Sequence, residues 1–329
     1  MEIIAEIGQA HDGSLGILHS YIDALAETGI NTIKFQVHIA DSESSEFEEF
    51  RVKFSYVDKT RFDYWRRMEF SCDQWREIKT HCESRNMEFL ASTFSIAAVE
   101  MMESIGLKRY KIGSGELSNY LMLKRIVSTG KPILLSTGLS NFSEIDETIE
   151  FLKDALDRIS IFQCTTEYPT RPENIGLDII PLLKLRYKLP VGFSDHSGKF
   201  YTSLAAIAMG AEKIEFHAVF DRRMFGPDAL SSLTISEISE LVSGVRYLEE
   251  IFNSMGRKEI ISEKNKAIFG KSIALRRDLK AGEVIYFEDL ESKKPSNLGI
   301  PAKNFQSIIG KKINKDKKRN SFLSYDDLE

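Results

Sequence analysis

The sequence predicts an α/β fold, a (β/α)8 TIM barrel followed by a small β-rich domain. Short apolar segments alternate regularly with amphipathic helical patterns, and the apolar segments are continuous rather than alternating in polarity. Continuous apolar strands indicate burial on both faces of a sheet. Eight such strand–helix units within about 250 residues are typical of a barrel. A doubly wound open sheet is the alternative, but GSLG at 13–16 is not the glycine-rich first turn of its nucleotide-binding form.

Eight strands are expected, each followed by a helix. The first helix covers about 15–28, and the last covers about 235–252. An unusually long segment, 40–70, separates the second strand from the helix at 72–85; because it is charged and aromatic, it either shapes a substrate pocket or packs as an extra helix. The expected strands are 2–7, 31–36, 87–92, 109–114, 131–137, 159–164, 189–194 and 212–217.

The composition changes after the last barrel helix. We expect a barrel domain at 1–254, a polar linker at 255–268 and a second domain at 269–329. The second domain contains an internal repeat, because DLKAGEVIYFEDLE (278–291) and DKKRNSFLSYDDLE (316–329) align without gaps. A domain of about 60 residues has a thin core, so we expect it to lean on the barrel or on a second subunit.

Charge and cysteine content exclude several classes of protein. The formal net charge of −5 argues against a nucleic-acid partner, whose binding surface would be basic. Three cysteines without CxxC spacing indicate a reducing compartment, and Cys164 is expected to be a core thiol. We see no signal peptide and no stretch of the roughly 20 apolar residues that a membrane helix needs. We therefore expect a cytoplasmic protein.

Polar or ionisable side chains follow every predicted strand. Active sites of (β/α)8 barrels lie at the carboxyl ends of the strands. The sequence therefore predicts one lined pocket at that end. Its candidate residues are Glu6, Lys34, Gln36, Ser92, Lys111, Ser114, Glu116, Ser136, Thr137, Thr165, Tyr168, Ser194, His196 and His217.

Two of these candidates are lysines. Lys34 and Lys111, together with the glycines and Ser114 of GSGE, could form a cradle for phosphate and carboxylate groups. A desolvated lysine at a strand end could instead form a Schiff base. The lysines alone leave both chemistries open.

Two histidines close the seventh and eighth strands. His196 and His217 could bind a divalent metal with open coordination positions, or they could be ordinary hydrogen-bonded residues at strand ends. With only two protein ligands, Mn2+ or Mg2+ is favoured over a structural zinc. Glu6 and Asp228 are candidates for acid–base chemistry or for binding hydroxyl groups.

Seven motifs follow one another along the chain: AEIGQAHDG, IKFQ, YKIGSGE, CTTEYPT, GFSDHSG, IEFH and FGPD. In this order they resemble the motifs of the sialic acid synthase family, whose members condense phosphoenolpyruvate with amino sugars. The C-terminal region is similar to the family's antifreeze-like (SAF) module, so that the resemblance covers nearly the whole chain.

The resemblance implies a metal-dependent condensation. Phosphoenolpyruvate and the open-chain aldehyde of an N-acylated amino sugar would give a nine-carbon sugar acid and phosphate. The SAF module would reach over the active site of the partner in a domain-swapped homodimer, with Lys294 near the sugar. His196 and His217 would bind Mn2+ or Mg2+. Phosphoenolpyruvate would be bound by Lys34, Ser92, Lys111, Ser114 and Ser194. Sugar hydroxyl groups and proton transfer would involve Glu6, Gln36, Glu116, Tyr168 and Asp228.

Five positions depart from the family's motifs: Ala10, Thr93, Thr166, Phe216 and Lys294. Because an arginine fork and a lysine are not interchangeable, Lys294 leaves the sugar contact open. The acceptor is therefore either N-acetylmannosamine or a 2,4-diamino-2,4,6-trideoxyhexose. A class I Schiff-base lyase and a carbohydrate-binding protein with a decayed barrel remain alternative interpretations.

Overall fold

The computed structural model describes residues 1–254 and 262–329. The chain divides into two compact units, Met1–Asn253 and Ser254–Glu329, and each is described by itself. The predicted linker, 255–268, falls in part on 255–261, outside the described residues. Its last residues belong to a short helix, α11 (Glu263–Phe269).

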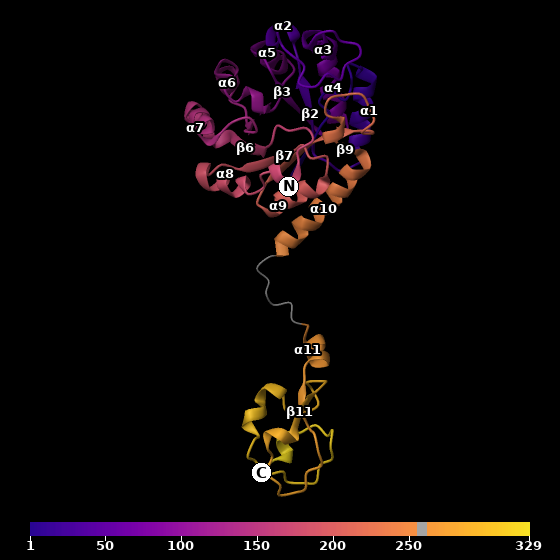
Figure 1. Ribbon diagram of the computed structural model, residues 1–329, viewed down its shortest axis with the longest axis vertical. Coiled ribbons are helices and arrows are strands. Elements are labelled where there is room, and N and C mark those ends of the chain that lie inside the picture. The colour runs from indigo at the N-terminus through magenta and orange to yellow at the C-terminus, as the bar shows by residue number, and fades with distance from the viewer. Residues whose placement is uncertain (255–261) are drawn as a thin grey trace. The chain divides into compact units, whose positions relative to one another are not determined.

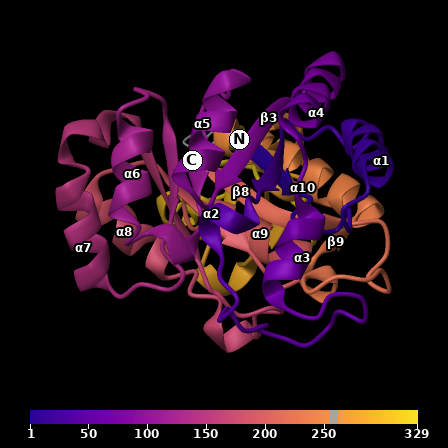
Figure 2. The same cartoon turned by 90° about the horizontal axis from the view of Figure 1, so that it is seen from above.

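The first unit is a closed barrel of eight parallel strands (Figures 1 and 2). The predicted barrel is confirmed, and the alternative of an open sheet is wrong, because β1 pairs with both β2 and β8. A short ninth strand, β9 (Leu233–Thr234), pairs with β8 and was not predicted. The barrel strands are β1 (Glu2–Glu6), β2 (Thr32–Val37), β3 (Glu88–Thr93), β4 (Tyr110–Ile112), β5 (Ile133–Ser136), β6 (Ile159–Cys164), β7 (Val191–Asp195) and β8 (Lys213–Val219).

Helices surround the strands (Figure 2). Several begin at a side chain that accepts a backbone N–H, as at Ser71, which forms a reciprocal capping box with Gln74. The helices that follow barrel strands are α1 (Leu15–Ala26), α4 (Cys72–Ser84), α5 (Ile96–Ser104), α6 (Tyr120–Val127), α7 (Phe142–Phe151), α8 (Ile179–Tyr187), α9 (Phe200–Ala208) and α10 (Ile235–Ser254). Single 3-10 turns lie at Ser114–Glu116, Lys153–Arg158, Pro172–Asn174 and Ala229–Ser231.

The barrel interior changes from apolar to polar along the strands. A buried layer of Ile4, Leu90, Leu134 and Phe162 fills the barrel axis. Gly192 makes room for this layer, since a Cβ at this position would lie 2.5 Å from the Phe162 ring. Side chains alternate between the two faces of a strand, so the next inward residues lie two positions further on. Those residues include Glu6, Ser92 and Ser136, and they form the floor of the pocket described below.

The long segment between β2 and α4 contains two helices, α2 (Ala40–Glu43) and α3 (Arg61–Met68). It forms its own apolar cluster, which consists of Ala40, Phe50, Phe54, Phe62, Tyr64, Trp65 and Met68. Several of the same side chains line the pocket. The segment therefore packs as an extra helix and also shapes the pocket, where the sequence had left these as alternatives.

The second unit is built on the predicted repeat. Leu279 and Lys317 exchange backbone hydrogen bonds of 2.9 Å at equivalent positions of the two copies. Around this pair the contacts are duplicated: Lys280 Nζ lies 2.7 Å from Asp316, and Lys318 Nζ lies 2.9 Å from Asp278. The two copies are thus related by a local pseudo-two-fold axis.

Each copy of the repeat also ends in the same way, in a 3-10 turn capped by a buried aspartate, Asp289 or Asp327. The unit contains β10 (Ser272–Leu275) paired with β11 (Leu290–Lys293), and 3-10 turns at Phe287–Asp289, Ala302–Ser307 and Tyr325–Asp327. Its core consists of Ile273, Leu275, Leu279, Ile285, Ile300, Ile308, Ile313 and Leu323.

Within the described ranges, 1–254 and 262–329, no helix has both the length and the apolar character needed to cross a membrane.

Candidate active site

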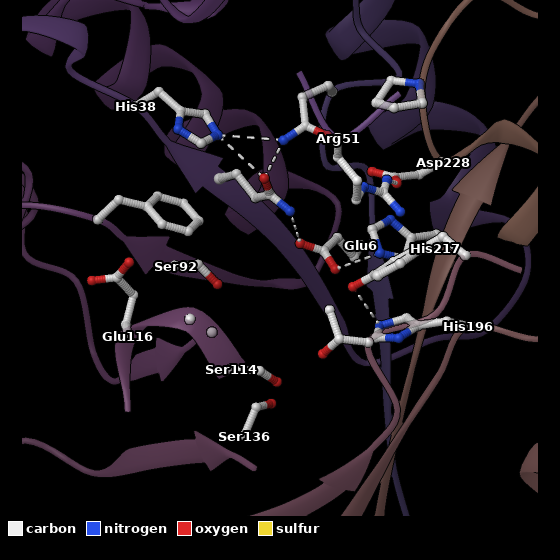
Figure 3. A pocket seen from close by; sticks show the side chains of 18 of the residues that line it. Glu6, His38, Arg51, Ser92, Ser114, Glu116, Ser136, His196, His217 and Asp228 are labelled. Atoms are coloured by element: carbon white, nitrogen blue, oxygen red, sulfur yellow. Dashed lines mark hydrogen bonds and ion pairs between the residues drawn. The ribbon is translucent and has the colours of Figure 1, made fainter. Parts of the chain in front are cut away.

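A pocket of about 440 Å³ opens at the carboxyl ends of the barrel strands (Figure 3). It brings together the predicted site residues of the first unit except Thr137 and Thr165, which do not line it. Lys294 lies in the second unit, exposed at the end of β11, with its ammonium 5.1 Å from the ring of Phe269. The predicted residues that line the pocket are Glu6, Lys34, Gln36, Ser92, Lys111, Ser114, Glu116, Ser136, Tyr168, Ser194, His196, His217 and Asp228.

The floor of the pocket is a buried network of two lysines and two glutamates. Lys34 Nζ donates to Glu6 Oε1 at 2.6 Å and lies 3.4 Å from Glu215 Oε1. Lys111 Nζ lies 3.2 Å from Glu215 Oε2. The strand register explains why these side chains lie close together, because Glu6 is opposite both Lys34 and His217 in the sheet.

Burial and opposite charges have opposing effects on the pKa values of these groups. Burial alone would raise the pKa of Glu6, but Lys34 and His217 hold that pKa well below its usual range. Burial would lower the pKa of Lys34, but Glu215 and Glu6 raise it. The pKa of Glu215 is likewise lowered, against burial, by Lys111 and Lys34. Both carboxylates and Lys34 are therefore charged at neutral pH.

Serine hydroxyl groups surround the lysines. Lys34 Nζ donates to Ser92 Oγ at 3.2 Å. Lys111 Nζ donates to Ser136 Oγ at 2.6 Å and to Ser194 Oγ at 3.5 Å. Ammonium groups and hydroxyl groups at one point are suited to binding phosphate or carboxylate oxygens.

The two histidines face one another on the opposite side of the pocket, with ring centroids 5.5 Å apart (Figure 3). His196 Nδ1 lies 2.8 Å from the Thr165 carbonyl oxygen, and a carbonyl can only accept, so Nδ1 carries the proton. Burial lowers the pKa of His196 to about 3, so the ring is neutral and Nε2 keeps its lone pair. His217 Nε2 lies 3.2 Å from Glu6 Oε2.

A neutral imidazole with a free lone pair fits a divalent metal. Across residues 1–254 and 262–329, no set of three or more His, Cys, Asp or Glu side chains is arranged to hold a metal ion. A metal at His196 and His217 would therefore depend on substrate or water for its remaining ligands.

Tyr168 and Asp228 are linked by an arginine from the long segment. The Arg51 guanidinium lies 4.4 Å from the centroid of the Tyr168 ring, and its Nη2 donates to Asp228 Oδ1 at 2.8 Å. The Tyr168 hydroxyl lies 3.2 Å from His196 Nε2. Burial and Asp228 raise the pKa of Tyr168, so its hydroxyl stays protonated and can donate to His196.

The far wall is aromatic and acidic. The His38 ring is stacked between Trp65 and Phe94, at 3.9 and 4.6 Å between centroids, and its Nδ1 lies 2.5 Å from Glu43 Oε1. Glu116 lies nearby, and burial together with Glu43 raises its pKa. A carboxyl with a raised pKa is suited to exchanging a proton with a bound substrate.

Sequence reasoning missed Glu215 and most of this wall. Glu215 had a signal, because it precedes His217 by two residues and therefore shares its face of β8. His38, Glu43, Arg51 and Trp65 had none, since they lie in or beside a loop segment without strand periodicity. Cys164, expected in the core, is buried but lines the pocket, with Sγ 3.1 Å from Ser114 Oγ.

Of the five departures from the family's motifs, only Thr166 lines this pocket. Phe216 points outward from β8 into the core between strands and helices. Thr93 is buried beside Met122, and Ala10 packs against the core. Phe216 is thus removed from the substrate side of the strand that carries His217.

Comparisons with known proteins identify the family of the chain. The NeuB family model matches residues 21–258, and the SAF domain model matches residues 270–329. The chain is 34% identical to the N,N'-diacetyllegionaminic acid synthase of Campylobacter jejuni, over 98% of both chains. It is 30% identical to human N-acetylneuraminate-9-phosphate synthase, covering 94% of this chain and 88% of that protein.

A solved structure agrees as well. The N-acetylneuraminic acid (sialic acid) synthetase of Leptospira borgpetersenii, solved with citrate, superposes with a TM-score of 0.70 at 28% identity, covering 80% of this chain and 88% of that chain. The family resemblance and the SAF domain are therefore confirmed. The chain belongs to the NeuB family and is an enzyme of the sialic acid synthase type.

Proposed function

We propose that this enzyme condenses phosphoenolpyruvate with the open-chain aldehyde of an N-acylated amino sugar. Water is consumed, and the products are a nine-carbon sugar acid and inorganic phosphate. One observation carries the proposal: a floor of lysines and serines, suited to anions, faces His196 and His217 across a single pocket.

The acceptor is either a 2,4-diamino-2,4,6-trideoxyhexose in N-acylated form or N-acetylmannosamine. The relative at 34% identity is named for legionaminic acid, and the human relative for N-acetylneuraminate. We consider the diamino sugar the first candidate, because the legionaminic acid synthase is the more similar of these two relatives and its match extends over 98% of both chains.

Phosphoenolpyruvate binds on the floor of the pocket. Lys34 and Lys111 attract its phosphate and carboxylate, and Ser92, Ser114 and Ser194 donate to its oxygens. Glu6 and Glu215 offset the positive charges of the two lysines. The floor therefore orients the anion through directed contacts rather than through an excess of positive charge. This arrangement places the anion opposite the histidines.

The reaction forms a bond between C3 of phosphoenolpyruvate and the aldehyde carbon. The C2=C3 electron pair forms this bond, and the hydroxyl of water adds at C2. Phosphate then leaves from C2 and takes the proton of that hydroxyl as the C2 carbonyl forms, while the water's other proton goes to the former aldehyde oxygen. Glu116 exchanges this proton, while Glu6, Gln36, Tyr168 and Asp228 bind the sugar hydroxyls or position the groups around them.

His196 and His217 would hold a divalent metal, Mn2+ or Mg2+. Such an ion, when bound, supplies Lewis acidity toward an aldehyde oxygen. The Tyr168 hydroxyl, which donates to His196 Nε2 in this structure, would yield that lone pair to the ion, and Thr165 fixes the tautomer of the ring.

A class I Schiff-base lyase is less well supported. An imine-forming lysine must be neutral to attack a carbonyl. Glu215 and Glu6 raise the pKa of Lys34, which keeps the amine protonated. If the chain were a carbohydrate-binding protein with a decayed barrel, polar residues at the strand ends would be missing. Here these residues are present and converge on one pocket.

We further propose that the enzyme acts in the cytoplasm as a domain-swapped homodimer. In this arrangement the SAF domain of one copy covers the barrel mouth of the other, with Lys294 near the sugar. Neither nucleic acid nor a membrane is a partner in this proposal.

Phosphate release from phosphoenolpyruvate tests the proposed function directly. The purified chain is incubated with each N-acylated amino sugar of a panel, with and without Mn2+ or Mg2+, and product masses are recorded. We expect release only when sugar and metal are both present, and its loss in His217→Ala. Release that survives EDTA and His217→Ala would reject the metal, and borohydride trapping of substrate on a lysine would favour the lyase.

A further inference from the structure

Two histidines outside the pocket face one another on adjacent barrel helices. His19 lies on α1 and His81 on α4, and these helices pack side by side (Figure 2). Their Nδ1 atoms are 2.8 Å apart, and each side chain is 23% exposed. A surface hollow beside them is lined by His19, Asp73, Arg76, Glu77, Thr80, His81 and Ser84.

Each outer nitrogen of the pair lies against a carboxylate. His19 Nε2 is 3.3 Å from Glu77 Oε1, and His81 Nε2 is 3.2 Å from Asp23 Oδ1. The contacts therefore form a chain of three gaps: Glu77 to His19, His19 to His81, and His81 to Asp23. The His19–His81 and His81–Asp23 gaps have hydrogen-bond geometry, and the His19–Glu77 gap does not. All three lie between electron-rich atoms, so that a proton or another cation in each of them lowers the repulsion.

Two neutral imidazoles supply only two protons for these three gaps. A carboxylate oxygen facing an unprotonated ring nitrogen is repulsive, so the two outer gaps take the protons that are available. The inner gap, between the two Nδ1 lone pairs, is then left without a cation. One more positive charge is needed there, and it is either a shared proton or a metal ion.

We propose that His19 and His81 bind a divalent transition-metal ion of the imidazole-preferring class, such as Zn2+, through their Nδ1 atoms. This site is separate from the pocket, because neither histidine lines it. The arrangement is that of a metal-binding histidine, whose other nitrogen typically donates to a carboxylate. Here His81 Nε2 has such a hydrogen bond, to Asp23, and His19 Nε2 lies 3.3 Å from the Glu77 carboxylate without a hydrogen bond.

The geometry requires only a small adjustment. Zn–N bonds of about 2.0–2.1 Å at a tetrahedral angle place the two nitrogens about 3.3 Å apart. The 2.8 Å separation therefore widens by about half an ångström, which side-chain rotation on two helices can provide. Water completes the coordination.

The surrounding charges also favour a cation. Asp23, Asp73 and Glu77 carry negative charge, and Arg76 and Arg85 are the cations paired with this group. With neutral histidines the cluster therefore has one negative charge in excess. Imidazole nitrogens suit Zn2+, Cu2+ or Ni2+ rather than Mg2+, so this site differs in preference from the one proposed in the pocket.

Zn2+ binding to the full-length chain tests the proposal. The titration uses a His196→Ala/His217→Ala background, which removes the other pair of histidines, and Zn2+ is the only ligand. We expect one ion per chain, lost in His19→Gln and in His81→Gln. Thr80→Ala, which alters the hollow but removes no ligand, serves as the matched control and retains the ion.

Cu2+ electron paramagnetic resonance provides a second measurement that does not depend on activity. The background variant should show coupling to two imidazole nitrogens, and His81→Gln should lose this two-nitrogen signal. Circular dichroism melting curves establish that each variant is folded. Absence of Zn2+ binding, or binding that both glutamine variants retain, would overturn the proposal and leave a shared proton in the inner gap.

Discussion

At the residue scale, the pocket depends on a carboxylate that two lysines share. Glu215 lies 3.4 Å from Lys34 Nζ and 3.2 Å from Lys111 Nζ, and its side chain is 3% exposed. A buried charge that loses its partner is destabilising, because it has neither water nor a counter-ion. Glu215 therefore supplies the counter-charge to Lys111 and, together with Glu6, to Lys34 before an anionic substrate arrives.

Replacing this carboxylate should lower stability and leave anion binding intact. Glu215→Gln is expected to reduce the free energy of unfolding by about 3 kcal/mol, the size typical of breaking a buried ion pair. Phosphoenolpyruvate should then raise the melting temperature more than in the unmodified protein, because its negative charge replaces the missing one. Differential scanning fluorimetry with and without phosphoenolpyruvate measures both effects.

Glu212→Gln is the matched control for this substitution. Glu212 pairs with Lys184 at 2.7 Å, and both side chains are nearly half exposed. An exposed pair contributes less than about 1 kcal/mol, so this variant should melt close to the unmodified protein. A Glu215→Gln protein with much weaker phosphoenolpyruvate binding would instead assign Glu215 to orienting the lysines.

A second residue-scale effect concerns pH and His11. The ring is 1% exposed, its Nδ1 accepts the Gly13 N–H at 3.0 Å, and burial lowers its pKa from 6.5 to about 3. The unfolded chain binds a proton at pH values where the folded chain does not, so stability rises with pH between about 3 and 6.5. This contribution is complete above pH 6.5 and is lost on acidification.

His11→Asn should reduce that pH dependence, since its amide oxygen can still accept from Gly13. Between pH 7 and pH 5 the histidine contributes a loss of about 2 kcal/mol, or 1.36 kcal/mol per pH unit below 6.5. Urea unfolding at the two pH values should show a loss smaller by this amount in the variant. Other buried histidines contribute equally to both proteins, and parallel pH profiles would contradict the assignment.

At the element scale, the strands could be predicted and the pocket wall could not. Each strand is a buried apolar run that ends in a polar residue, and the barrel geometry brings these ends together. The wall formed by His38, Arg51 and Trp65 depends on aromatic contacts within the long segment. No periodicity fixes such contacts, because they arise from side-chain packing rather than from a repeating backbone.

The packing of β6 against β7 inside the barrel depends on one glycine, Gly192. A Cβ at Gly192 would lie 2.5 Å from the Phe162 ring, and both residues face the barrel axis. Gly192→Ala is therefore expected to cost about 1–3 kcal/mol by overpacking. Denaturant unfolding should show this loss, and Phe162→Leu in the same chain should restore part of it.

Gly115→Ala provides the comparison, because no atom lies within 4 Å of the Cβ position and its backbone needs no glycine. Its stability should stay near that of the unmodified protein. Equal losses at Gly192 and Gly115 would show that the Phe162 contact is not the cause.

At the scale of the whole molecule, sequence and structure agree within each of the two units. The repeat in the SAF domain could be found from the sequence, since the aspartates that cap its turns align with one another. The proposed dimer would depend on contacts between copies, and a single sequence carries no periodic signal for such contacts. The domain-swapped dimer is therefore best tested by mixing chains that carry different defects.

His217→Ala removes a pocket residue of the barrel, and Lys294→Ala alters the SAF domain. In a domain-swapped dimer each site combines the barrel of one copy with the SAF domain of the other. A mixed dimer therefore contains one site in which both parts are intact. We expect each variant alone to have little activity, and an equal mixture, unfolded and refolded together, to recover about a quarter of normal phosphate release.

The recovered fraction follows from subunit statistics, because half of the dimers are mixed and each has one complete site of two. Lys293→Ala, whose ammonium contacts Asn320 and Glu291, is the matched control and should be active alone. If the mixture recovers nothing while Lys294→Ala alone is inactive, each SAF domain serves its own barrel. If Lys294→Ala alone is fully active, Lys294 makes no contact with the sugar, and the exchange must be tested with another residue of the same domain.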